Sequence, residues 1–204
     1  MIAMKSLRWI LTPLSVATVI LIIWYLIFQH PALLLLSTIF FILTMVFMIF
    51  FRDPKREIEE GIISPADGKI RSIDKLDDRL RVSIFMNIHN VHVNRIPIEG
   101  TVTSVEHTPG KHKLAFKKTA ANNERVLTKI QTMIGEVQIE QITGAFARRI
   151  VPYISPGTYV KKGQKLGIVR FGSRVDLYLP AEKVKVVVQK GVKIKAGNTI
   201  AEFI

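Results

Sequence analysis

Two uncharged apolar runs near the N-terminus constrain this chain more than any other feature of its sequence. The first extends from Trp9 to Phe28 and the second from Ala32 to Phe51, and neither contains Asp, Glu, Lys or Arg. Each run is about 20 residues long, the length that a helix needs to cross the hydrocarbon core of a bilayer. A buried helical pair of a soluble core is the alternative. The length and the lack of charge favour a transmembrane helical hairpin over residues 1–52.

The charges that flank the two runs predict their orientation. Lys5 and Arg8 precede the first run, and Arg52, Lys55 and Arg56 follow the second. A hairpin places both of its ends on one side of the membrane, and the positive-inside rule makes that side cytoplasmic. A cleaved signal peptide fits poorly, because the first run is long and a second follows at once. We therefore expect the remaining chain to be held at the cell membrane, facing the cytoplasm.

The overall charge narrows the class of partner. The 204 residues have a formal net charge of +13 and include no cysteine, which excludes disulfides, cysteine-bound zinc and thiol nucleophiles. A basic protein favours an anionic partner, either a nucleic acid or an anionic membrane surface. Aromatic side chains are not interleaved with the basic ones, as nucleic-acid stacking surfaces require. Together with the two apolar runs, this predicts an anionic membrane and no nucleic acid.

The pattern changes after the second run. Residues 53–204 form short runs of β-branched and aromatic residues that are separated by Gly, Pro, Asn and Asp, as in "LRVSIFM", "GEVQIEQIT" and "RVDLYLP". Strands at such regular spacing are typical of a β sandwich or barrel. We therefore expect a mainly β, sandwich- or barrel-like second domain over residues 53–204.

An internal repeat lies at the C-terminal end of this domain. Residues 157–167 match residues 191–201 at an offset of 34, with the pattern G-x-x-V-K-x-G-Q-x-L-G. The pattern resembles the half-motif of biotinyl- and lipoyl-type carrier domains, in which two halves pack as a flattened β structure. The Met-Lys-Met turn that carries the cofactor in those domains is absent. The repeat therefore predicts a lipoyl-like fold and not a carrier function.

Three polar residues stand out in the first half of the β domain. Asp67 lies in "SPADGK", where an ordinary Asp-Gly turn is the alternative reading. His89 and His92 lie in "FMNIHNVHVNRIP", which reads as one strand. In a regular strand an offset of three residues places two side chains on opposite faces, so the histidines make a poor metal pair unless the strand bends. Without cysteine and with few other histidines, no zinc site is expected.

A Gly-Ser pair interrupts the strand-like run "IVRFGSRVDLYLP". A plain turn between two strands would explain it, but a serine, a histidine and an aspartate are also the parts of an activated hydroxyl. The hydrolase motif Gly-x-Ser-x-Gly is absent, because Phe171 and Val175 occupy its glycine positions. Since no side chain precedes Ser173 to block approach, its hydroxyl suits attack on the carbonyl of Gly172.

Four motifs in a fixed order suggest a family. "SPADGK", "HNVHVNRIP", "NNER" and "FGSR" follow one another behind a hydrophobic N-terminus, and this combination resembles the short form of phosphatidylserine decarboxylase. The resemblance implies a proenzyme that cuts itself between Gly172 and Ser173. The products would be a β chain of residues 1–172 and an α chain of residues 173–204, which stay together as a heterodimer. Ser173 would become an N-terminal pyruvoyl group, the covalent cofactor.

The same resemblance implies roles for the candidate residues. Asp67 would orient the base, His92 would be the base for self-cleavage, and Ser173 would be the nucleophile. His89 would serve the substrate carboxylate or a proton transfer during turnover. No metal is implied.

The implied chemistry needs a cofactor. Decarboxylation of phosphatidylserine to phosphatidylethanolamine and CO₂ leaves a carbanion, for which ordinary side chains offer no electron sink. A pyruvoyl ketone is such a sink. Longer members of the family read Leu-Gly-Ser-Thr, whereas Phe171 and Arg174 flank the pair here, so no role is assigned to these two residues. A membrane-anchored β adaptor without enzyme activity and a decarboxylase of ether-linked archaetidylserine are the alternatives.

Overall fold

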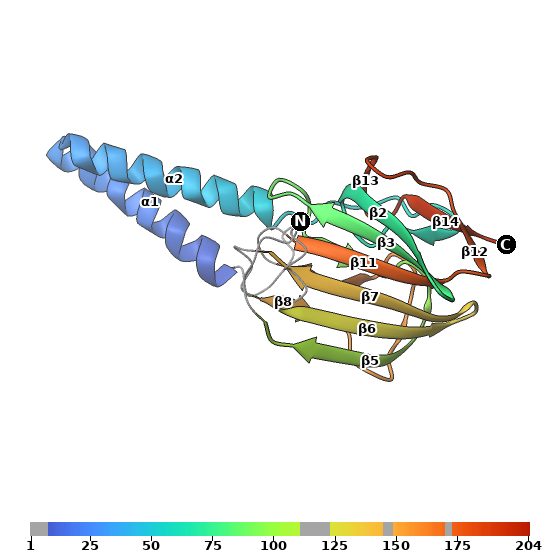
Figure 1. Ribbon diagram of the computed structural model, residues 1–204. Coiled ribbons are helices and arrows are strands. Elements are labelled where there is room, and N and C mark those ends of the chain that lie inside the picture. The colour runs from blue at the N-terminus through green and yellow to red at the C-terminus, as the bar shows by residue number, and fades with distance from the viewer. Residues whose placement is uncertain (1–7, 111–122, 145–148, 170–172) are drawn as a thin grey trace. The chain divides into compact units, whose positions relative to one another are not determined.

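The chain divides into two compact units, Met1–Pro54 and Lys55–Ile204. The computed structural model describes residues 8–110, 123–144, 149–169 and 173–204, and Figure 1 shows the helices of the first unit and the strands of the second.

The first unit holds two long apolar helices, α1 (Arg8–Phe28) and α2 (Pro31–Phe50). A two-residue break separates them, and the Ala32 backbone N–H donates to Nδ1 of His30, 3.3 Å away, which caps α2. Proline at the first position suits this helix start because its missing N–H would have no partner there. The apolar parts of α1 and α2 have mean hydropathies of 2.2 and 2.8. The two helices that the apolar runs predict are therefore confirmed.

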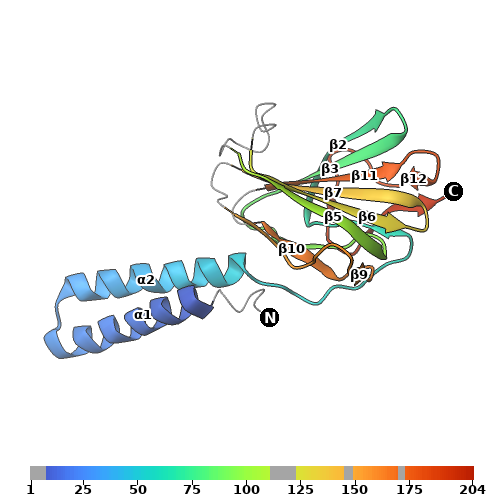
Figure 2. The same ribbon diagram turned by 90° about the horizontal axis from the view of Figure 1, so that it is seen from below.

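The second unit is mainly β, as its sequence texture predicts. Its strands in the described residues are β1 (Ile62–Ile63), β2 (Gly68–Leu76), β3 (Arg79–Met86), β4 (Val93–Arg95), β5 (Gly100–Thr108), β6 (Arg125–Thr132), β7 (Gly135–Thr143), β8 (Ile150–Pro152), β9 (Tyr159–Val160), β10 (Lys165–Val169), β11 (Ser173–Pro180), β12 (Val184–Val186), β13 (Lys193–Ile194) and β14 (Thr199–Phe203). Eight of them form one sheet in the order β13-β2-β3-β11-β7-β6-β5-β9. Two three-stranded sheets, β1-β14-β12 and β4-β10-β8, complete the unit, and Figure 2 shows β10 on one side of the large sheet.

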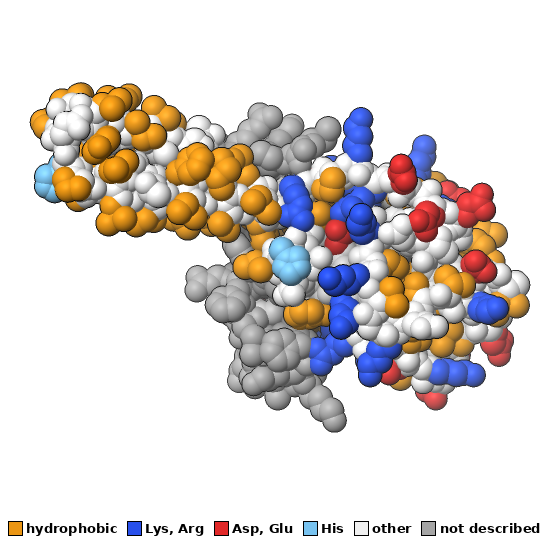
Figure 3. All heavy atoms as spheres, turned by 90° about the horizontal axis from the view of Figure 1, so that it is seen from above, with side chains coloured by type: hydrophobic (Ala, Val, Ile, Leu, Met, Phe, Trp, Pro, Cys, Tyr) orange, Lys and Arg blue, Asp and Glu red, His pale blue; other side chains and the backbone are white. Residues whose placement is uncertain are grey.

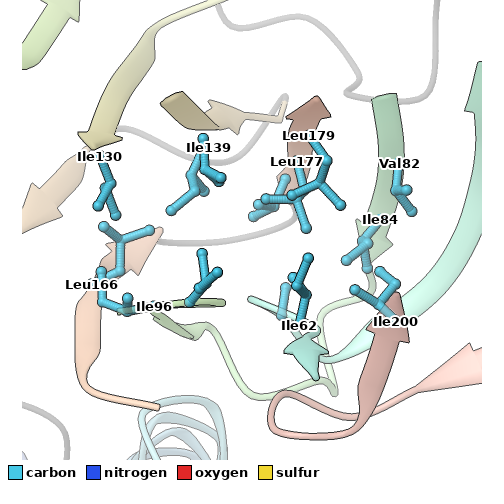
Figure 4. Packing of buried hydrophobic residues seen from close by; sticks show 14 of the residues in the cluster. Ile62, Val82, Ile84, Ile96, Ile130, Ile139, Leu166, Leu177, Leu179 and Ile200 are labelled. Carbon is cyan, nitrogen blue, oxygen red and sulfur yellow. The ribbon is translucent and has the colours of Figure 1, made fainter. Parts of the chain in front are cut away.

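The hydrophobic core lies between the large sheet and the two small ones. Side chains alternate along β11, so that Val175, Leu177 and Leu179 are fully buried and face inward. Across the core they meet residues of the small sheets such as Ile96 and Leu166, in one continuous cluster; Figure 4 shows the two facing layers. Burying each such side chain stabilises the fold by about 1.5–3 kcal/mol.

The internal repeat at offset 34 is also a repeat of structure. Gly157 and Gly191 both have positive φ angles (82° and 93°), and so do Gly163 and Gly197 (79° and 104°). Each copy consists of a two-residue strand, a turn and a five-residue strand, which are β9 and β10 in one copy and β13 and β14 in the other. The resemblance to lipoyl-type domains stays a prediction.

The structure reveals a second repeat that the sequence analysis missed. Residues 63–74 correspond to residues 95–106 at an offset of 32, and both segments carry a β-bulge at the same place. The repeated backbone hydrogen bonds are Ile70 N–H to Val192 O, Gly191 N–H to Ile70 O, Val102 N–H to Thr158 O and Gly157 N–H to Val102 O. The unit is therefore built from two similar halves. One half contains residues 63–74 and 191–201, and the other contains residues 95–106 and 157–167. β11 of the first half pairs with β7 of the second in the middle of the large sheet.

Candidate active site

Ser173 is the first residue of β11 in the middle of the large sheet. It lies opposite Met86 of β3 on one side and Thr143 of β7 on the other. Its side chain shares the inward face of β11, is fully buried, and its Oγ has no hydrogen-bond partner among the residues that the structure describes. Gly172 is one of residues 170–172, which lie outside the described residues. Most buried polar atoms in native structures have a hydrogen-bond partner, because leaving a buried hydroxyl without one costs free energy. A buried serine without a partner therefore calls for a functional explanation.

His92 is buried just before β4. Its Nδ1 lies 2.8 Å from the backbone oxygen of Asn90. Because a carbonyl oxygen only accepts hydrogen bonds, Nδ1 carries a proton, and Nε2 is the nitrogen that accepts when the ring is neutral. The backbone oxygen of His92 accepts from the N–H of Val169 at 3.2 Å. This bond joins His92 to the end of β10, directly before the segment that leads to Ser173.

His89 lies in a turn, and the single strand that the sequence analysis predicted for this region is wrong. β3 ends at Met86, and the N–H of Asn90 donates to the backbone oxygen of Asn87 at 2.9 Å. The Asn90 side chain accepts from the Asn87 N–H at 2.7 Å, which stabilises the turn as asparagine often does. His89 is exposed and His92 is buried, so their positions follow from the turn and not from strand alternation.

Asp67 precedes β2, and its carboxylate is held from two sides. Its Oδ2 lies 2.6 Å from Nη2 of Arg56, in an ion pair whose side chains are only 10% and 13% exposed. Its Oδ1 accepts from the backbone N–H of Ala196 at 2.8 Å. Both oxygens therefore have partners other than His92. The contact that orients the His92 ring in this structure comes from the Asn90 carbonyl.

Further polar side chains are buried close to Ser173, and the sequence analysis did not single them out. Nε2 of Gln141 donates to Oδ1 of Asn94 at 2.7 Å, and Nδ2 of Asn123 donates to the backbone oxygen of Thr143 at 2.7 Å. All four of these residues are at most 1% exposed. One signal was available, because Gln141 and Thr143 are polar residues that follow Val137 and Ile139 at the inward-facing positions of one strand.

An ionic network on the outer face of the sheet holds the start of β11. Nη2 of Arg174 lies 3.0 Å from Oδ2 of Asp176, and the Ser83 hydroxyl donates to the other carboxylate oxygen. Burial raises the pKa of Asp176, against the lowering effect of Arg174 and Ser83. Burial and the nearby Glu140, whose Oε2 accepts from the Tyr178 hydroxyl at 3.1 Å, raise the pKa of Tyr178 to about 12. The network ties β11 to β3 and β7 directly after Ser173.

The site residues include a buried hydroxyl, that of Ser173, and a buried imidazole, that of His92, whose Nδ1 carries a proton. Over the described ranges, no group of three or more His, Asp or Glu side chains could hold a metal ion. A hydroxyl and an imidazole are the side-chain groups from which a nucleophile and its general base are made.

Comparison with known proteins identifies close relatives. The model of a protein family described as phosphatidylserine decarboxylase matches residues 43–202. A phosphatidylserine decarboxylase proenzyme of Streptomyces coelicolor is 57% identical over 152 residues, which cover 74% of this chain and 69% of that protein. A protein of Methanococcoides burtonii, whose name assigns it provisionally as an archaetidylserine decarboxylase proenzyme, is 37% identical over 98% of this chain and 95% of its own length.

Proposed function

The chain belongs to the phosphatidylserine decarboxylase family and is a decarboxylase, and from this premise we propose its substrate and its maturation. It converts phosphatidylserine to phosphatidylethanolamine and CO₂ at the membrane. Before that it cuts itself between Gly172 and Ser173. The observation that carries the proposal is the fully buried Ser173 Oγ, which has no hydrogen-bond partner among the described residues.

Self-cleavage begins at the Ser173 hydroxyl. Its oxygen attacks the carbonyl carbon of Gly172 as its proton passes to a base, and the peptide C–N bond then breaks with the nitrogen taking that proton. The resulting ester loses the β chain as a carboxylate when the Cα proton of Ser173 is removed and its Cβ–O bond breaks. Addition of water and loss of ammonia then leave a ketone at the new N-terminus.

His92 is the proposed base. Its Nδ1–H is occupied by the Asn90 carbonyl, so Nε2 is the nitrogen that can take a proton. Its backbone bond to Val169 ties it to the segment that precedes the cleavage site. A positioned base of this kind contributes about 10²–10⁴-fold to a rate.

Asp67 and His89 complete the proposed site. Asp67 directly precedes β2, β2 pairs with β3, and β3 pairs with β11. Asp67 therefore lies about two strand spacings from Ser173, roughly 10 Å. We propose that its negative charge favours the protonated form of His92 after proton transfer, while Arg56 and Ala196 fix the carboxylate. His89 is exposed in the turn, where a substrate can reach it, and we assign it to the substrate carboxylate or to a proton transfer.

The residues around Ser173 fit a pyruvoyl group. Such a group would occupy the end of β11, and the polar side chains of Asn94, Gln141 and Thr143 line its surroundings. When present, it supplies the electron sink that decarboxylation requires. These buried side chains also limit the access of water to the reacting carbon.

The membrane is the proposed location of this reaction. A diacyl substrate stays in the bilayer, and α1 and α2 contain apolar stretches of 18 and 20 residues that are long enough to cross it. We propose a cell-membrane hairpin with the β unit on the cytoplasmic side, following the flanking charges. The relative that is 57% identical is named for phosphatidylserine, and this favours the diacyl lipid over its ether-linked counterpart.

Intact-mass spectrometry of the purified full chain tests the proposal. The wild-type protein should give two chains that meet between Gly172 and Ser173, with a ketone on the smaller one, and Ser173→Ala should give one chain. The cut protein should release CO₂ from vesicles of phosphatidylserine, and archaetidylserine vesicles serve as the comparison. A single intact wild-type chain would favour the non-enzymatic adaptor and contradict self-cleavage.

A further inference from the structure

A basic groove lies on the outer face of the large sheet, the face opposite to the one that the Ser173 side chain shares. Its volume is about 270 Å³. It is lined by Lys69, Ile70, Arg71, Phe85, Lys190 and Gly191. Figure 3 views the molecule from the side on which β13 and β2 lie in Figure 1, and Lys and Arg side chains gather over the middle of the β unit, whereas Asp and Glu lie mainly toward one end.

Two of the cations come from β2. Lys69 lies between Lys193 of β13 and Phe85 of β3 in the register of the sheet. Like charges directly opposite each other on neighbouring strands destabilise a sheet, and a bound anion would relieve this repulsion. Arg71 lies at the β-bulge between Ile70 and Ser72. Bulges re-aim side chains and are frequent beside functional sites, and this one adds a guanidinium to the same face.

The third cation comes from a loop that is fixed to β2. Lys190 precedes Gly191, whose N–H donates to the backbone oxygen of Ile70 at 2.8 Å. The N–H of Ile70 donates in return to the backbone oxygen of Val192 at 2.9 Å. These two bonds hold the loop against the strand, so the groove is defined by backbone pairing and not by flexible side chains alone.

The other half of the β unit shows that the fold does not require these charges. The residues that correspond to the groove are Thr101, Val102, Thr103, Gln131, Pro156 and Gly157. The glycine and the core residue between the two β-strand cations (Ile70, Val102) are kept, and every cation is replaced by an uncharged residue. Because the same backbone forms without charge in one half, the cations in the other half serve a purpose besides folding.

One carboxylate lies near the groove and is already occupied. Arg81 lowers the pKa of Asp74 most strongly, Ser72 contributes next, and Lys190 is the weakest of the contributors. Nη2 of Arg81 is 2.8 Å from Oδ2 of Asp74, and the Ser72 hydroxyl donates to the same oxygen at 2.8 Å. Arg81 and Ser72 thus hold the Asp74 carboxylate, and Lys190 is not its main partner.

We propose that this groove binds the phosphate-bearing headgroup of an anionic phospholipid other than the substrate. A guanidinium matches phosphate oxygens with paired hydrogen bonds, and lysines add point charges. The groove also has an apolar wall, the ring of Phe85, which lies beside Lys69 in the sheet, and this suits the carbon skeleton that joins a headgroup to its acyl chains better than a free phosphate ion. The site is independent of the Ser173 chemistry.

Binding of a soluble lipid to the full chain in detergent micelles tests this site. The probe is dihexanoyl phosphatidylglycerol, which lacks serine, and calorimetry compares it with dihexanoyl phosphatidylcholine and inorganic phosphate. The groove variant is Lys69→Thr/Arg71→Thr/Lys190→Gln, in which both threonines are those of the other half. A matched control with the same net charge, Lys161→Gln/Lys183→Gln/Lys185→Gln, alters exposed lysines elsewhere.

The groove variant should bind the anionic probe on the order of 100-fold more weakly, since each cation near an anionic headgroup contributes several-fold. The control should bind it as the wild type does. If the triple variant does not fold, Lys190→Gln alone should weaken binding about fivefold, in line with the contribution of one cation. Equal losses in both variants, equal binding of phosphatidylcholine, or equally strong binding of inorganic phosphate would each overturn the assignment.

Discussion

Replacement of Gly68 by alanine tests whether the position of Asp67 matters for maturation. A Cβ added at Gly68 would lie 2.3 Å from the backbone oxygen of Phe85 and 2.9 Å from its carbonyl carbon. Both atoms belong to the backbone of β3, so no side-chain rotation relieves the conflict. Repulsion between the new Cβ and the Phe85 oxygen rises steeply at distances below an ordinary contact of 3.4 Å. To restore that contact, β2 and β3 must separate by about 1 Å.

The repeated architecture provides a matched control. Gly100 is the counterpart of Gly68 in the other half, and a Cβ there would lie 2.2 Å from the backbone oxygen of Gln131. Both alanine variants should lower the free energy of unfolding by about 1–3 kcal/mol, the usual cost of overpacking. Only the change at Gly68 displaces Asp67, and a displacement of about 1 Å in a reacting site costs on the order of 100-fold in rate.

The assay follows the appearance of the two chains after cell-free synthesis in the presence of lipid. Gly68→Ala should mature on the order of 100-fold more slowly than the wild type, and Gly100→Ala should mature at nearly the wild-type rate. Thermal unfolding of both variants checks that they are destabilised alike. Equal slowing of the two would assign the effect to stability, and normal maturation of a destabilised Gly68→Ala would refute the role of Asp67.

Three further predictions follow from the site and its surroundings. His89→Ala should still split into two chains and carry the ketone, but it should decarboxylate the lipid about 10²–10⁴-fold more slowly. His92→Ala should stay uncut. The reverse pattern would mean that the two roles are exchanged. In urea unfolding, the wild type should lose more stability than Tyr178→Phe between pH 10 and pH 12. The Tyr178 phenol has a pKa of about 12 in the folded protein and of 10.0 when unperturbed. Between these values the folded state binds more protons than the unfolded state, so the free energy of unfolding falls as pH rises. Equal losses of stability in the wild type and Tyr178→Phe would contradict this. A high-salt wash should not extract the full chain from membranes, because insertion of α1 and α2 is not screened by salt, and extraction by salt would refute it.

The sequence predicts the parts of the fold that depend on local pattern. The uncharged runs predict both helices within one residue of their observed ends, because a helix that crosses a bilayer must lack charge along its whole length. The glycines at 157, 163, 191 and 197 reveal the repeat at offset 34, because each occupies a positive-φ turn in which another residue would be strained.

The second repeat is easy to overlook in the sequence because only a proline, a glycine and a serine are identical between its two copies. Other positions match only in type, such as Asp67 with Glu99 and Ile70 with Val102. In the structure the copies also share a close approach of backbones at the glycines and a bulge two to four residues later. Such features depend on partner strands that are distant in the sequence, so a local pattern does not reveal them.

The candidate residues were found by motif, but their contacts depend on tertiary structure. The run around His89 and His92 alternates as a strand does, and only the Asn87–Asn90 turn separates the two histidines. The ion pair of Asp67 lies within the second unit, and its partner Arg56 was treated in the sequence analysis only as a flanking charge. Ion pairs between distant segments leave no periodic signal in a sequence.

The position of the proposed cut predicts that the α chain stays bound afterwards. Every residue of β11 from Ser173 to Pro180 pairs with β3, and those up to Tyr178 pair with β7 as well, while β13 pairs with β2 and β14 with β1. Val175, Leu177 and Leu179 are completely buried, and each contributes about 1.5–3 kcal/mol.

Release of the α chain therefore requires removal of the central strand of the large sheet, which amounts to global unfolding. After cleavage the two chains should co-elute in size-exclusion chromatography in 1 M salt and separate only at denaturant concentrations that unfold the β unit. Leu177→Ala, which should cost about 2–5 kcal/mol, should lower that concentration, whereas Lys183→Gln at an exposed position should not. Loss of the α chain under native conditions would show that the pairing of β11 with β3 and β7 does not survive the cut.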